Sequence, residues 1–113
     1  MWQLRKLQKS GAVVALSSDY DVGPLSPLGH VGRALQLGAR SLPTAADALR
    51  AVTIEGAKIM GNDDDVDTLE VGKLADFVVL DRDVLAASPA DIIQTNVVLT
   101  AVGGEVVWKS SAF

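Results

Sequence analysis

Residues 69–81 of this chain read Leu69-Glu70-Val71-Gly72-Lys73-Leu74-Ala75-Asp76-Phe77-Val78-Val79-Leu80-Asp81. Gly72 is placed for a tight turn, because glycine adopts positive φ angles without steric cost. The nearly continuous apolar run over 74–80 after that turn predicts a strand. An acidic stretch over 62–67 comes before the turn and is predicted to be a solvated connector. The sequence therefore predicts an acidic connector, a tight turn and a strand in this order.

Downstream of this stretch, two more strands are predicted, over 96–102 and 105–108. The Gly103-Gly104 pair between them supplies the positive φ angles of a type I′ turn, which predicts a β-hairpin. Before the hairpin, Ser88-Pro89 followed by Asp91 predicts a short helical turn, because proline is tolerated at the first helical position.

Upstream of the stretch, helices are predicted over residues 2–10, 28–37 and 45–60. The last of them has the clearest boundaries. Thr44 and Asp47 form an approximate capping box at its start, and Gly61 is placed to end it.

The charge-free run over 12–16 predicts a fully buried parallel strand. Polar residues follow at the carboxyl end of this strand, among them Asp19, and a loop rich in glycine and proline over 23–27 comes next. A carboxylate in that position is typical of the catalytic end of a (β/α)8 barrel. The alternative is that Asp19 only solvates the end of the strand.

Composition excludes several classes of protein. Of the 113 residues, 49% are hydrophobic, which indicates a folded chain, and the absence of cysteine excludes disulfides, thiolate metal ligands and cysteine nucleophiles. No leader opens the chain and no apolar run approaches the roughly 18 residues that span a membrane, so a cytoplasmic protein without a membrane partner is predicted. Residues 1–60 carry seven Lys/Arg against four Asp/Glu, and residues 61–113 carry three against ten. This asymmetry favours two subdomains and predicts no nucleic-acid partner.

Four segments resemble, in the same order, motifs of the amidohydrolase superfamily, and specifically its YtcJ-like branch, amidohydrolase family 3. They are the strand that ends at Asp19, the helix from Thr44 to Gly61, the turn and strand at Gly72–Asp76, and the closing hairpin Leu99–Val107. The chain departs from the family pattern at Asp21-Val22-Gly23, a small insertion before the proline, and at Asp67-Thr68, where the family has glycine and serine.

This resemblance implies a partial α/β fold. Residues 1–61 would be the last β/α unit of an amidohydrolase (β/α)8 barrel, and residues 62–113 the C-terminal part of a small antiparallel β-sandwich domain. A complete barrel takes roughly 250 residues, so most of it has no counterpart in this chain.

The resemblance also implies that Asp19 is both the catalytic residue and a metal ligand, because the matching aspartate binds the metal and carries the proton of the attacking water. The complete enzyme would hold zinc or another divalent metal. No metal is expected in the isolated chain, because a catalytic zinc site takes three protein ligands and His30 is the only histidine. His30 is predicted to be a surface or loop residue.

Other motifs are predicted to be structural. The acidic run Asp63–Asp67 lacks the glycine and glutamate of an EF-hand loop. Gly72-Lys73 does not form a phosphate-binding loop, because Asp67 stands where that motif needs glycine and a strand follows in place of a helix. Ser17 and Ser18 lack the surroundings of a nucleophile elbow.

Two functions remain open from the sequence. The first is a C-terminal fragment of a metal-dependent amidohydrolase that acts on amide-type C–N bonds of small molecules and is inactive in isolation. The second is a non-catalytic assembly or binding module derived from such an enzyme. In both cases, the apolar strands predict that the chain pairs with itself or with the missing N-terminal barrel portion.

Overall fold

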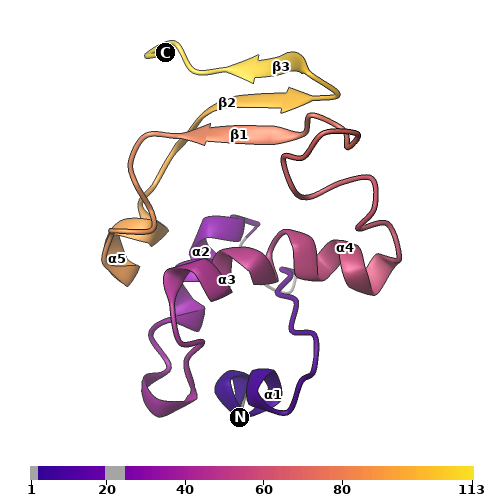
Figure 1. The fold of residues 1–113 in the computed structure, drawn as a ribbon. Helices are drawn as coiled ribbons and strands as arrows, with labels where there is room; N and C mark the ends of the chain where they lie inside the picture. Colours follow the sequence, from indigo (N-terminus) through magenta and orange to yellow (C-terminus); the bar gives the residue numbers. More distant parts are fainter. Residues whose placement is uncertain (1–2, 20–24) are drawn as a thin grey trace.

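The computed structural model describes residues 3–19 and 25–113; Trp2 of the first predicted helix and Gly23-Pro24 of the predicted loop lie outside this part. The elements are α1 (Leu4–Lys9), α2 (Pro27–Ala34), the 3-10 helix η2 (Gly38–Arg40), α3 (Ala45–Ala51), α4 (Ile54–Met60), β1 (Phe77–Leu80), α5 (Pro89–Ile93), β2 (Val97–Val102) and β3 (Glu105–Lys109). In Figure 1 the helices lie on one side of the sheet, with β1 nearest to them and β3 at the far edge. The chain is an α/β protein with a small antiparallel sheet.

Side-chain caps fix where the helices start. The Thr44 hydroxyl accepts a hydrogen bond from the Asp47 N–H at 3.1 Å, and the Ser88 hydroxyl accepts one from the Asp91 N–H at 3.2 Å, which confirms both predicted caps. Ser26 caps α2 in the same way, so this helix begins at Pro27. No helix within the described residues is long and apolar enough to cross a bilayer.

The single helix predicted over 45–60 is wrong, because the chain forms α3 and α4 with a break at Val52 and Thr53. Thr53 has φ −128° and ψ −106°, and its hydroxyl donates to the Leu49 carbonyl oxygen at 2.9 Å. A β-branched residue that uses its hydroxyl in this way weakens the helix at that point. The predicted end at Gly61 is confirmed, since its φ is +77°.

The strand predicted over 12–16 is also wrong. These residues form no ladder with any described strand. The apolar pattern was strand-like, but a strand needs a neighbour to accept its backbone hydrogen bonds. The sheet that the chain does form lies elsewhere and is built from residues after 76.

The sheet has the order β1-β2-β3 and the predicted hairpin. Gly103 and Gly104 have φ +58° and +84°, which confirms the type I′ turn. The first strand was predicted over 74–80 but begins only at Phe77. The residues before it bind the connector and the hairpin turn: the Leu74 N–H donates to the Asp65 carbonyl oxygen at 2.9 Å.

One hydrophobic core joins residues from both ends of the chain. Its buried members are Leu4, Val31, Ala34, Leu42, Ala48, Ala51, Val84 and Ile92. Helix α5 packs against α2, so the segment after residue 62 shares the core of the segment before it. The sheet contributes fewer buried side chains to this core, and every residue of β3 is exposed.

Candidate functional site

The extended segment from Ala12 to Ser18 leads to the predicted site. Val14 and Leu16 pack against the core, whereas Ala15 and Ser17 are exposed, so the side chains alternate as they do in a strand. Among the described residues, the backbone N–H groups over 12–17 make only two hydrogen bonds to backbone oxygens, from Ala12 to Leu7 and from Leu16 to Ala51. The segment therefore shows the alternating exposure of a strand, and among the described residues it has no strand neighbour.

Asp19 ends this segment in an unusual conformation. Its φ is +52°, in the left-handed region that non-glycine residues enter mainly when they are aspartate or asparagine. The Asp19 N–H donates to the Ser17 hydroxyl at 3.4 Å, and the residue is exposed. The carboxylate is therefore accessible at the end of the segment, where the sequence predicts it to act.

The part of the chain that the structure describes was compared with the ligand set that a metal needs. Within residues 3–19 and 25–113, the structure brings together no group of three or more histidine, cysteine, aspartate or glutamate side chains that could hold a metal ion. A catalytic zinc takes three protein ligands, so Asp19 can supply at most part of such a set.

His30 does not lie where the sequence predicted. It belongs to α2 and is partly buried, and its Nε2 atom is buried without a hydrogen-bond partner among the described residues. His30 lines a groove of about 610 Å³ between α1, α2 and the extended segment, together with apolar residues such as Leu4 and Leu16. The groove runs along residues 12–17 of this segment.

The turn at Gly72 has the structural role predicted for it. Gly72 has φ +94°, and the Lys73 ammonium donates to the Asp63 carbonyl oxygen while pairing with Glu70 at 3.1 Å. The Asp76 carboxylate accepts a hydrogen bond from the Gly103 N–H at 2.7 Å. These side chains hold the acidic connector and the hairpin turn in place.

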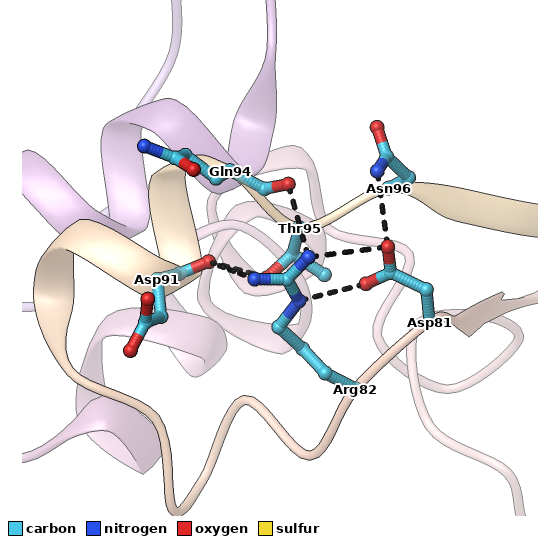
Figure 2. Close-up of polar contacts among 6 residues, drawn as sticks. All are labelled: Asp81, Arg82, Asp91, Gln94, Thr95 and Asn96. Carbon is cyan, nitrogen blue, oxygen red and sulfur yellow. Dashed lines mark hydrogen bonds and ion pairs between the residues drawn. The ribbon is translucent and has the colours of Figure 1, made fainter.

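A second polar network, which the sequence did not reveal, surrounds Arg82 (Figure 2). The Arg82 guanidinium pairs with Asp81 at 2.9 Å and donates to the carbonyl oxygens of Asp91 and Gln94, and the Asn96 amide donates to Asp81 at 3.0 Å. The network ties the end of β1 to α5 and to the start of β2. Its only sequence signal was the Asp81-Arg82 pair of opposite charges directly after a strand.

This network makes the stability of the fold depend on pH in the acid range. Hydrogen bonds from Arg82 and then from Asn96 lower the pKa of Asp81 to about 2. Because the folded pKa lies below the usual value of about 3.9, the stabilisation is present above pH 4 and is lost as the pH falls toward 2.

We expect the melting temperature of Asp81→Asn to fall less than that of the unmodified chain between pH 4.5 and pH 2, measured by circular dichroism. Asp64→Asn in the acidic connector is the control, and an equal response of both variants would contradict this role.

Comparison with known proteins identifies the lineage. The model of a family described as "Amidohydrolase family" matches residues 3–108. This chain belongs to the amidohydrolase family. Among its amidohydrolase relatives, N-substituted formamide deformylase from Arthrobacter pascens is 32% identical over 112 residues, covering 92% of this chain and 21% of that protein. Imidazolonepropionase from Fusobacterium nucleatum is 36% identical over 83 residues, covering 73% of this chain and 20% of that protein.

Solved structures with a similar fold agree with the family match. An amidohydrolase from Thermotoga maritima superposes with a TM-score of 0.76 at 29% identity, covering 95% of this chain and 26% of that one. Guanine deaminase from E. coli gives a TM-score of 0.77 at 23% identity and so shares the fold. This amidohydrolase chain spans about a fifth of the length of the curated relatives it matches.

Proposed function

We propose that this chain is the C-terminal part of a metal-dependent amidohydrolase that hydrolyses non-peptide, amide-type C–N bonds of small molecules. Residues 1–61 would be the last β/α unit of the catalytic barrel, and residues 62–113 part of the small β-domain. The observation that carries the proposal is the family match over residues 3–108, which includes Asp19. The names of the relatives, a formamide deformylase and an imidazolonepropionase, favour C–N bond hydrolysis.

The partner that we propose is the remaining barrel portion of the enzyme. The extended segment over 12–17 supports this, because its backbone has few partners and the groove beside it is mostly apolar. A strand from another part of the barrel would satisfy that backbone. The chain by itself is proposed to be inactive.

Zinc or another divalent metal is the cofactor that we propose for the complete enzyme. Asp19 would supply one carboxylate to it, and the other ligands would come from the rest of the barrel. The exposure of Asp19 supports this role, because its carboxylate is not occupied by an ion pair within the described part of the chain.

A chimera tests the proposal. Residues 3–108 replace the matching region of the Arthrobacter pascens deformylase, and hydrolysis of an N-substituted formamide is measured. We expect the chimera to be active and Asp19→Asn to lower its kcat/KM by about 100-fold or more, the usual effect of losing a general acid–base group. Asp65→Asn in the acidic connector is the matched control and should leave kcat/KM unchanged.

The outcomes separate the two functions. A chimera that keeps its activity with Asp19→Asn would refute the role of Asp19. A folded chimera that binds metal but has no activity would favour the alternative, a non-catalytic assembly or binding module derived from an amidohydrolase. Stoichiometric zinc in the isolated 113-residue chain, measured by mass spectrometry, would contradict the inference that its ligand set is incomplete.

A further inference from the structure

The outer edge of β3 has no strand neighbour within residues 3–19 and 25–113. β3 is the last strand in the order β1-β2-β3 and lies at the edge far from the helices in Figure 1. All of its residues are exposed. An edge strand presents a row of unpaired N–H and C=O groups, which is a template for pairing with another strand. The sheet therefore ends in a surface that can accept one more strand.

The middle of this edge strand is apolar. Val106, Val107 and Trp108 are 58%, 61% and 50% exposed. Val107 also has no partner residue on β2, because the register passes from Val106 opposite Ala101 directly to Trp108 opposite Thr100. Adjacent apolar residues on an exposed strand edge mark a site of association.

The two ends of β3 carry opposite charges. The strand begins with Glu105 and ends with Lys109, and neither forms an ion pair in the part of the chain that the structure describes. When two copies of the strand lie antiparallel about a two-fold axis at Val107, Glu105 of each copy stands opposite Lys109 of the other. The same register places Val106 opposite Trp108. Opposite charges, and aromatic with β-branched residues, are the cross-strand pairs that stabilise antiparallel strands.

We propose that this chain forms a two-fold symmetric dimer in which the β3 strands of two copies pair antiparallel and join their sheets. A two-fold dimer uses the same surface of both chains, so each cross-strand pair occurs twice. The self-complementary charges of β3 favour a second copy of this chain over a strand of other sequence. A strand this short buries less than the roughly 1,200 Å² of a stable interface, so the dimer should be weak and form only in concentrated solution.

Sedimentation equilibrium of the whole chain from about 10 µM to about 1 mM, the range in which unpaired strand edges associate, tests the proposal. We expect the mass to rise from one chain toward two. Glu105→Lys and Lys109→Glu each place like charges opposite one another twice, so either change alone should raise the Kd about tenfold or more. An equal mixture of the two variants should associate again, because opposite charges then face each other at both positions. Asp64→Lys in the exposed connector is the matched control: it changes the net charge as Glu105→Lys does and should leave the Kd unchanged.

A chain that keeps the mass of one copy at about 1 mM overturns the proposal and leaves this edge to another occupant, such as the remaining barrel portion. A dimer whose Kd responds to neither charge reversal also overturns it, because its interface would be another surface. A mixture of the two variants that associates no more strongly than each variant alone refutes the antiparallel register. None of these results alters the chimera experiment, so the proposed function is tested separately.

Discussion

Gly32→Ala is expected to destabilise the chain by about 3 kcal/mol, the upper part of the range for overpacking a tightly packed contact. A Cβ atom at Gly32 would lie 2.4 Å from Ile93 Cγ1 and 2.7 Å from the Pro89 carbonyl oxygen. The isoleucine side chain can rotate away, but the carbonyl belongs to the backbone of α5. Helix α5 would therefore have to move off α2, and the core between them would open.

Gly56→Ala is the matched control for this substitution. Gly56 also lies inside a helix, α4, and a Cβ atom there would meet nothing within 4 Å. Alanine in place of glycine in a helix interior should stabilise by about 0.5–1 kcal/mol. Urea unfolding followed by circular dichroism measures both variants. Similar free energies of unfolding for the two would contradict the close approach of α2 and α5.

The features that the sequence predicted correctly are those decided by a few neighbouring residues. The Thr44 cap, the left-handed Gly61 and the Gly103-Gly104 turn each depend on contacts within about four positions. Capping and turn preferences are local effects, so the sequence contains all the information that they need. The Gly72 turn belongs to the same class.

The features that the sequence missed depend on contacts between distant residues. The run over 12–16 has a strand pattern, but whether it pairs depends on strands that the described chain does not bring beside it. From the sequence, Gly32 is only a glycine within a predicted helix. Its close approach to α5 arises only when the two helices pack together. The Arg82 network likewise arises only when separate segments pack together. For the site, the sequence indicated Asp19 as a candidate, and its role stays a prediction. The sequence did not indicate the partial burial of His30.

Ile92→Ala is expected to lower the free energy of unfolding by about 2–5 kcal/mol, the range for truncating a fully buried isoleucine. Ile92 is 0% exposed and belongs to the core cluster that also contains Leu4 and Ala48. The cavity left behind would therefore weaken the packing of core residues that come from the segment before residue 62 and from the segment after it. Val107→Ala is the control, because Val107 is 61% exposed on β3 and its truncation should change stability by no more than about 0.5 kcal/mol.

Hydrogen exchange of the same Ile92→Ala variant tests whether the core unfolds as one unit. If the cluster is shared, amides in α3 and in β2 should lose protection by the same factor, because both exchange through the same global opening. Residues 1–61 and 62–113 would then be one cooperative unit in the isolated chain, even though the family resemblance predicts that they belong to different domains of the complete enzyme. Faster exchange confined to α5 and β2 would instead mean that the second segment opens by itself, and the division predicted at residue 61 would be an energetic boundary as well.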